Sequence, residues 1–184
     1  MRIIAGEFRG RKLASVKSQS LALRPTRDRV RESVFNILQS QQTIHGTRIL
    51  DIFAGTGAMG LEAISRGADS AIFVENSRES RRLLRENISS LQLEVRSRII
   101  AEDATRLGAN DTDPTSIVFL DPPYGKGLGL AALSALTTGG WLSADALIVW
   151  EESTHMSAPP SFATVDHRKY GASHITLMRY LPCV

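Results

Sequence analysis

The sequence predicts an α/β domain in which a mostly parallel β-sheet is covered by helices. Apolar segments of strand length alternate with amphipathic segments of helix length along most of the chain. A glycine-rich loop follows the first expected strand of this alternation and opens a helix. The segment 116–120 is apolar throughout, which is typical of a strand that is covered on both faces.

The expected elements follow one another in a regular order. A helix with Thr26 as its N-cap precedes the sheet and ends before Gly46. The last two strands, around Gly171, are expected to form an antiparallel hairpin, so the sheet has seven strands in all. The expected strands are 48–53, 70–74, 95–100, 116–120, 146–150, 162–170 and 174–181, and the helices between them are 59–66, 77–90 and 128–136.

The overall composition fits a globular protein of one main domain. Of the 184 residues, 42% are hydrophobic and 22% are charged, which is ordinary for a folded enzyme. No apolar run approaches the roughly 20 residues of a membrane helix, and the first residues lack the apolar core of a signal peptide. Cys183 is the only cysteine, so an internal disulfide is excluded. We therefore expect a cytoplasmic protein.

Positive charge is concentrated at the start of the chain. Residues 1–31 hold nine basic and two acidic side chains, a net charge of +7, so the other 153 residues sum to −4 within a total of +3. We expect residues 1–22 to form a basic extension and linker, with a small β-hairpin over 1–13, and residues 23–184 to form the main domain. Such a basic segment is typical of a phosphate-binding surface, although a solvated surface explains the charge equally well.

The glycine-rich loop points to a nucleoside cofactor. Gly55-Thr56-Gly57-Ala58-Met59-Gly60 has the Gly-x-Gly-x-x-Gly spacing, which lets the backbone turn sharply and approach a ligand closely. Glu75 ends the second expected strand, where a carboxylate can accept hydrogen bonds from two ribose hydroxyls. The loop and the acid together predict a cofactor site.

Asp51 decides which nucleoside this site favours. It lies four residues before Gly55, where its negative charge would repel the diphosphate of a dinucleotide. S-adenosylmethionine carries a cationic ammonium and a cationic sulfonium, and opposite charges about 4 Å apart attract by roughly 4 kcal/mol at an effective dielectric constant near 20. We therefore expect S-adenosylmethionine. Asp103, after the third strand, could accept a hydrogen bond from the adenine amino group or be a solvated turn residue.

A second motif, Asp121-Pro122-Pro123-Tyr124, directly follows the apolar fourth strand. Ligands of open α/β sheets bind beyond the carboxyl ends of the strands, so this tetrad is expected to face the cofactor. An exocyclic amino nitrogen is a poor nucleophile because its lone pair is delocalised into the ring. The Asp121 carboxylate and the Pro122 carbonyl can hold its two N–H groups and direct the lone pair, while Pro123 stiffens the loop and Tyr124 stacks on the base.

Two further groups of residues carry weaker signals. Glu151 and Glu152 follow the fifth strand and could either line the cleft or be solvated. The four histidines, His45, His155, His167 and His174, lack the spacing of metal ligands, so no metal centre is expected.

The motifs together carry a family resemblance. MRIIAGEFRGRKL, RPTRDRVRESVFNIL, LDIFAGTGAMGLEAISRGA and FLDPPYGKG resemble, in this order, the RsmD-like family of small-subunit (16S) ribosomal RNA guanine-N2 methyltransferases. The resemblance spans nearly the whole chain. It implies a class I S-adenosylmethionine-dependent methyltransferase fold, which is Rossmann-like, and a guanine amino group of 16S ribosomal RNA as the methyl acceptor.

The resemblance also assigns residues to roles. The cofactor would be bound by Asp51, Gly55, Thr56, Gly57, Glu75, Asp103 and Ala104, and the target base by Asp121, Pro122, Pro123 and Tyr124. RNA would be bound by Arg2, Arg9, Arg11, Lys12, Arg24, Thr26, Arg27 and Arg31. The implied partner is 16S ribosomal RNA, within an intermediate of small-subunit assembly, and we expect the enzyme to act as a monomer.

Three alternatives stay open at this point. The tetrad does not distinguish guanine from adenine or cytosine, in RNA or in DNA. The glycine fingerprint alone would also fit a nicotinamide-dependent oxidoreductase. A non-enzymatic RNA-binding assembly factor could keep the same fold. RNA is favoured over DNA because 184 residues leave no room for the added recognition domain that DNA methyltransferases generally need, whereas a short basic arm can bind structured RNA by shape and phosphate.

Overall fold

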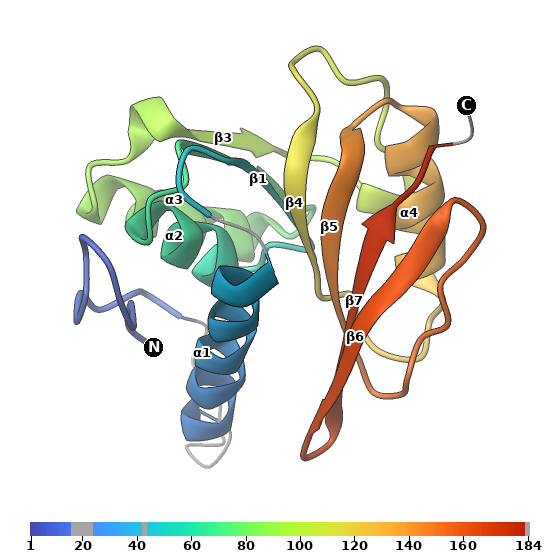
Figure 1. Cartoon of the computed structure of the whole chain (residues 1–184). Helices are drawn as coiled ribbons and strands as arrows, with labels where there is room; N and C mark the ends of the chain where they lie inside the picture. The colour runs from blue at the N-terminus through green and yellow to red at the C-terminus, as the bar shows by residue number, and fades with distance from the viewer. Residues whose placement is uncertain (16–23, 42–43, 183–184) are drawn as a thin grey trace.

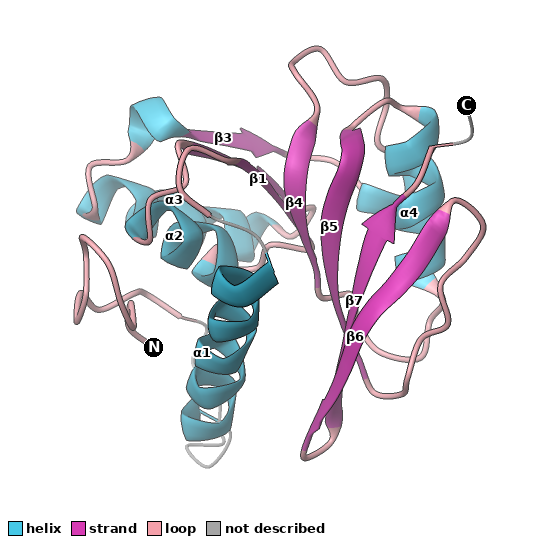
Figure 2. Ribbon diagram, in the orientation of Figure 1, coloured by secondary structure: helices cyan, strands magenta, loops and turns pink. Residues whose placement is uncertain are grey.

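The protein forms a seven-stranded sheet with helices on both faces (Figures 1 and 2). The computed structural model describes residues 1–15, 24–41 and 44–182, with the side chains of the first helix described from Asp28 to Ser40. In the described ranges the helices are α1 (Arg24–Gln41), α2 (Ala58–Ser65), α3 (Arg78–Ser90) and α4 (Leu128–Thr138), with the 3-10 helices η2 (Glu94–Arg96) and η3 (Ala104–Arg106). The strands are β1 (Arg48–Ile52), β2 (Ser70–Val74), β3 (Ser97–Ile100), β4 (Thr115–Leu120), β5 (Leu142–Glu152), β6 (Phe162–Tyr170) and β7 (Ser173–Tyr180).

The strand order creates a site at one edge of the sheet. The order is β3-β2-β1-β4-β5-β7-β6. Strands β6 and β7 form the expected antiparallel hairpin, and β7 also runs antiparallel to β5. The order reverses between β1 and β4, which is the point where open α/β sheets bind ligands beyond the carboxyl ends of the strands. Ile52 pairs with Val74 on one side and with Leu120 on the other, so these three strands end at the same level.

Alternating side chains of the strands build two cores, one on each face of the sheet. Ile49, Phe73 and Phe119 belong to the cluster that α1, α2 and α3 cover. Leu50, Val118 and Trp150 belong to the cluster that α4 covers on the other face. Period-two alternation along buried strands produces this division, and it fixes which side chains reach the carboxyl edge.

The N-terminal segment packs onto the helical layer of the first core (Figure 1). We call residues 1–15 the basic arm. Its two ends run antiparallel, with the Ile3 N–H donating to the Arg11 carbonyl at 3.0 Å and the Leu13 N–H donating to the Met1 carbonyl at 3.1 Å. The hairpin expected for 1–13 is thus reduced to one isolated bridge, between Arg2 and Lys12, without regular strands. Ile3 and Leu13 are buried in the core, and the burial of these two apolar side chains anchors the arm to the domain.

One buried side chain joins the basic arm to the glycine-rich loop. Asn87, on α3, is 1% exposed. Its Oδ1 accepts a hydrogen bond from the Ala14 N–H at 2.6 Å, and its Nδ2 donates to the Ala14 carbonyl at 3.1 Å. The same Nδ2 donates to the Thr56 carbonyl at 2.9 Å. A buried amide that is satisfied in this way fixes the relative positions of the three segments.

Several element ends differ from the sequence-based expectations. Helix α1 begins at Arg24, so Thr26 lies inside the helix and is not its N-cap. Strand β3 begins at Ser97 because the residues just before it form η2. Strand β5 is longer than expected; it includes Asp145, whose φ of +61° marks an irregular position beside a register shift in the pairing of β4 with β5. In the described part of the chain, no helix has the length and apolar character needed to cross a membrane.

Candidate active site

Asp51 lies at the centre of the carboxyl edge. It is buried at the end of β1, and its Oδ2 accepts a hydrogen bond from the Gly60 N–H at 2.9 Å. A Cβ at position 60 would overlap the ring of Phe73, so this close approach requires glycine. Burial raises the pKa of Asp51 to about 8; the hydrogen bond from Gly60 opposes this shift, and the charges of Asp121 and Glu75 add to it. Asp121 and Glu75 are therefore close enough to Asp51 for their charges to disfavour its ionised form.

Glu75 directly follows β2 and shapes the glycine-rich loop. Its Oε2 accepts a hydrogen bond from the Gly55 N–H at 2.8 Å, and its Oε1 accepts one from the Ser77 N–H at 2.7 Å. Gly55 and Gly57 have φ values of +57° and +81°, which side chains rarely adopt. A Cβ on Gly57 would also overlap Leu84. The loop conformation therefore depends on both glycines and on the carboxylate that holds Gly55.

Asp103 and Ala104 lie beyond β3 at the same edge. Asp103 is exposed and caps η3, because its Oδ1 accepts hydrogen bonds from the Thr105 N–H at 2.9 Å and the Thr105 hydroxyl at 2.8 Å. These two hydrogen bonds lower the pKa of Asp103. Ala104 is buried in the core beneath it. The carboxylate is thus ionised and held in a fixed orientation beyond the strand end.

The tetrad, residues 121–124, lies at the same carboxyl edge, on the other side of β1 from Glu75. Asp121 follows β4 and is exposed, Pro122 is buried, and Pro123 and Tyr124 are exposed. The Tyr124 hydroxyl donates a hydrogen bond to Glu151 Oε1 at 2.8 Å. The pKa of Tyr124 is raised, mainly by partial burial. The phenol therefore stays protonated and remains a donor to Glu151.

The end of β5 supports this loop. Leu120, the last residue of β4, pairs with Trp150, so the tetrad begins beside the last two residues of β5, Glu151 and Glu152. Glu152 is buried, and its Oε1 accepts a hydrogen bond from the Gly125 N–H at 3.3 Å. Glu151 and Glu152, which the sequence left as either cleft or solvated residues, thus both contact the tetrad loop. The structure makes them the last two residues of β5, and their position at the carboxyl end of a strand that neighbours β4 is the signal that could have identified them.

The structure separates the residues expected to contact RNA into three groups. Arg2, Arg9, Arg11 and Lys12 are exposed on the basic arm. The Arg11 Nη2 also donates a hydrogen bond to the Ser90 carbonyl, at 2.9 Å. The side chains of Arg24, Thr26 and Arg27 lie outside the described residues.

The expectation for Arg31 needs correction. Arg31 is 4% exposed, and its Nη2 donates a hydrogen bond to the Arg2 carbonyl at 2.6 Å. Its guanidinium lies between Asp28 and Glu62, at 3.1 and 3.7 Å. A buried, paired guanidinium is not accessible to a phosphate, so Arg31 supports the fold beneath the arm and does not contact RNA.

Comparisons with known proteins agree with this geometry. A family model described as "Conserved hypothetical protein 95" matches residues 1–179. The chain is 38% identical over 181 residues to ribosomal RNA small subunit methyltransferase D of Escherichia coli K12, covering 98% of this chain and 89% of that protein. The solved structure of the putative methyltransferase yhhF from Escherichia coli superimposes with a TM-score of 0.85 at 36% identity, covering 98% of both chains.

A second solved structure, of a putative methylase from Haemophilus influenzae, has a TM-score of 0.80 at 29% identity and also covers 98% of both chains. The two superpositions extend over the basic arm and the terminal hairpin as well as the central sheet, since so little of either chain is left out. On the family match and on the 38% identity to the Escherichia coli enzyme, the chain belongs to the RsmD-like methyltransferase family.

Proposed function

We propose that this protein is an S-adenosylmethionine-dependent methyltransferase that modifies the exocyclic N2 amino group of a guanine in 16S ribosomal RNA. The observation that carries the proposal is the gathering of three acids at the carboxyl edge, where Asp51 is buried at the end of β1, Glu75 follows β2 and Asp121 follows β4. A space lined by acids attracts a cationic methyl donor and repels a diphosphate. Relatives named as small-subunit ribosomal RNA methyltransferases support the choice of acceptor.

The residues at this edge fit the cofactor. Asp51 would attract its cationic methionine end, and Glu75 would accept hydrogen bonds from the ribose hydroxyls through its remaining lone pairs. Asp103 and Ala104 would lie beside the adenine. The glycine-rich loop, including Thr56, would bring backbone against the ligand without a Cβ in the way. When bound, the cofactor supplies a methyl group on a sulfonium sulfur, and the carbon–sulfur bond that breaks on transfer leaves a neutral thioether.

The tetrad would prepare the acceptor nitrogen. The Asp121 carboxylate and the Pro122 carbonyl would accept its two N–H groups, and this geometry directs the lone pair toward the methyl carbon. The nitrogen gains a bond to carbon and loses a proton, which Asp121 would accept. Tyr124 would stack on the flipped-out base, held by its hydrogen bond to Glu151. Pro123 limits movement of the loop.

The substrate and setting follow from the same reasoning. The exposed cations of the basic arm would bind phosphates of 16S ribosomal RNA within a small-subunit assembly intermediate. The chain would act as a monomer in the cytoplasm, where such particles are assembled. The assignment of ribosomal RNA as the partner rests on the surface charge of the arm and on the relatives' names.

The decisive experiment is mass mapping of methylated bases. We expect 16S ribosomal RNA from cells that lack the protein to be short of one N2-methylguanine, and the purified protein with S-adenosylmethionine to restore it. If the missing methyl group were instead on an adenine or a cytosine, that base, and not guanine, would be the methyl acceptor. An unchanged methylation pattern, together with tight dinucleotide binding by calorimetry, would overturn the proposal.

A further inference from the structure

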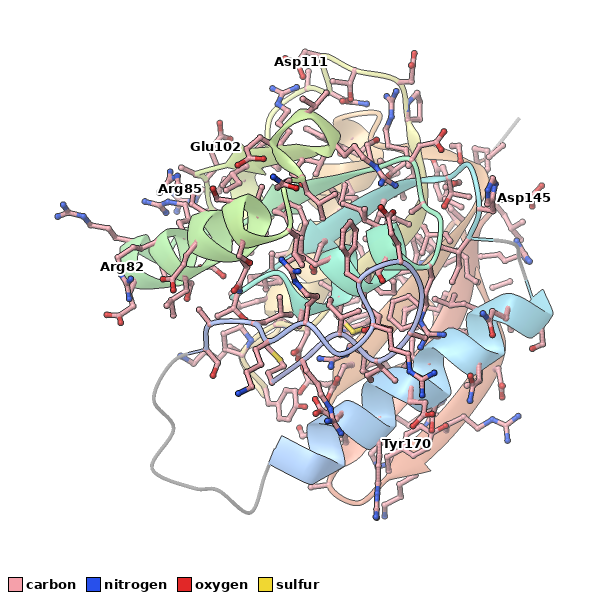
Figure 3. All side chains as sticks on the ribbon, turned by 90° about the vertical axis from the view of Figure 1, so that its left-hand side faces the viewer. Arg82, Arg85, Glu102, Asp111, Asp145 and Tyr170 are labelled. Carbon is pink, nitrogen blue, oxygen red and sulfur yellow. The ribbon has the colours of Figure 1, made fainter. Side chains whose placement is uncertain are left out.

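Helix α3 carries a line of exposed arginines that the proposed site does not use. Arg78, Arg82 and Arg85 are exposed, and their spacing of four and three residues places them on one side of the helix. We call these three residues the α3 arginine row. Figure 3 shows Arg82 and Arg85 projecting from α3 into solvent. Arg81 differs from them, because it is partly buried and its Nη1 donates a hydrogen bond to the Glu75 carbonyl at 3.0 Å.

The charge of this row is poorly neutralised within the protein. Among the described residues, Arg78 and Arg85 form no ion pair, and Arg82 lies 3.3 Å from Glu86 and 3.9 Å from Glu79 on the exposed helix surface. By contrast, Arg98 forms two hydrogen bonds with the Asp111 carboxylate, at 2.7 and 3.0 Å. Like charges four residues apart disfavour a helix, and α3 contains two such arginine pairs, at 78/82 and 81/85. A cationic surface that its own fold does not neutralise is suited to an external polyanion.

The position of α3 connects this surface to both parts of the proposed site. At its first turns, Arg81 contacts the backbone of Glu75 at the carboxyl edge. At its last residue, the Ser90 carbonyl accepts the hydrogen bond from Arg11 of the basic arm. The helix has 13 residues and so is about 20 Å long. The α3 arginine row therefore lies on the exposed side of a helix whose first turn contacts the carboxyl edge and whose last residue contacts the basic arm.

We propose that the α3 arginine row is a second phosphate-binding surface for the RNA acceptor. The inference rests on the proposed function, because it takes the arm and the carboxyl edge as the two ends of the RNA path. The planar guanidinium matches the geometry of a phosphate. Phosphate contacts of this kind fix register and orientation without reading sequence. The row would orient the RNA so that the target guanine reaches Asp121.

Charge reversal in the full-length protein tests this proposal. The variant R78E/R85E changes the net charge by −4 at the row. The matched control R168E/K169E makes the same change on β6, at the opposite edge of the sheet from β3. Affinity for protein-free 16S ribosomal RNA is measured at several salt concentrations, and S-adenosylmethionine affinity is measured by calorimetry.

We expect R78E/R85E to lower RNA affinity at least ~10-fold at low salt and to reduce the log–log salt slope by roughly 1.4 to 1.8, since each lost phosphate contact removes about 0.7 to 0.9. Cofactor affinity should be unchanged, and the control should keep the wild-type slope. An unchanged slope in R78E/R85E, or an equal loss in the control, would overturn the role of the row. A wild-type protein that binds the RNA through the row but transfers no methyl group would overturn the proposed function alone.

Discussion

The Glu62 carboxylate lies 3.7 Å from the guanidinium Nε of Arg31, and both side chains are buried. Glu62 also accepts hydrogen bonds from the Arg66 Nε at 2.7 Å and from the backbone N–H groups of Ile4 and Ala5, at 2.8 and 3.0 Å. One carboxylate thus joins α1, α2 and the basic arm. Burying a charge is favourable only when partners of this number surround it.

The first prediction concerns stability. Glu62→Gln removes the negative charge between two buried arginines, and we expect it to lower the free energy of unfolding by about 3–5 kcal/mol. Urea denaturation measures this loss. Glu86→Gln, which removes an exposed partner of Arg82, should cost about 1 kcal/mol or less. A similar small loss for Glu62→Gln would show that the buried network does not hold the arm.

The second prediction concerns the transfer step. Asp121→Ala should keep S-adenosylmethionine binding, because Asp51 and Glu75 remain, but should lose at least ~10²-fold in transfer rate. Single-turnover transfer of labelled methyl to 16S ribosomal RNA measures the rate, and calorimetry measures cofactor binding. Normal turnover by this variant on the true substrate would refute the role assigned to Asp121.

The third prediction follows from the raised pKa of Asp51, about 8 in the folded protein. At neutral pH the free protein holds a proton on Asp51, whereas a cationic ligand favours the ionised carboxylate. Binding of S-adenosylmethionine should therefore release a proton, and its affinity should rise with pH, up to about tenfold per unit, until it levels off above pH 8. Calorimetry in buffers of different ionisation enthalpy detects this release.

Asp51→Asn is the control for that pH dependence. The amide oxygen can still accept the Gly60 N–H, but it has no proton to exchange. We expect weaker cofactor binding with a flat pH profile between pH 6 and 9. The wild-type protein should also lose stability as pH rises from about 4 to 8, because its unfolded chain releases the Asp51 proton first. The Asp51→Asn variant should lack this pH-dependent loss of stability. If its cofactor affinity depended on pH in the same way as that of the wild type, the titrating group would be a residue other than Asp51.

The fourth prediction separates the ring of Tyr124 from its hydroxyl. Tyr124→Ala removes the proposed stacking surface and should lower kcat/KM for RNA by roughly 5- to 150-fold, the equivalent of about 1–3 kcal/mol per stacked base. Tyr124→Phe keeps the ring and loses only the hydrogen bonds of the hydroxyl with Glu151 and Ser173, so its loss should be much smaller. Equal losses in the two variants would mean that the hydroxyl, and not the ring, acts on the substrate.

Local sequence signals located the fold and the carboxyl edge. The bounds of β2 and β6 match the expected segments, because both are short β-rich runs between clear turn residues. The glycine-rich loop and the tetrad each follow a strand, so their placement at one edge follows from the parallel sheet alone. Strand β3 was harder to delimit, since a single turn of 3-10 helix over 94–96 has no distinct apolar period.

The buried ion network had no comparable local signal. Arg31 shares a helix face with Arg27 in the sequence pattern, which is typical of a solvated surface. It is buried because Glu62, 31 residues later, faces it across the helix packing. The single acid in the apolar helix Ala58–Ser65 was the one available hint. Contacts between distant segments of this kind depend on the tertiary fold, so a pattern read within one helix does not show them.

The side-chain amide of Asn87 couples the basic arm to the glycine-rich loop, because it forms hydrogen bonds with both. Trimming the chain from its start would therefore do more than subtract positive charge. It would remove two of the three hydrogen bonds of the buried Asn87 amide and allow the backbone around Thr56 to adopt other conformations. A protein that lacks the basic arm should therefore bind S-adenosylmethionine less tightly even in the absence of RNA.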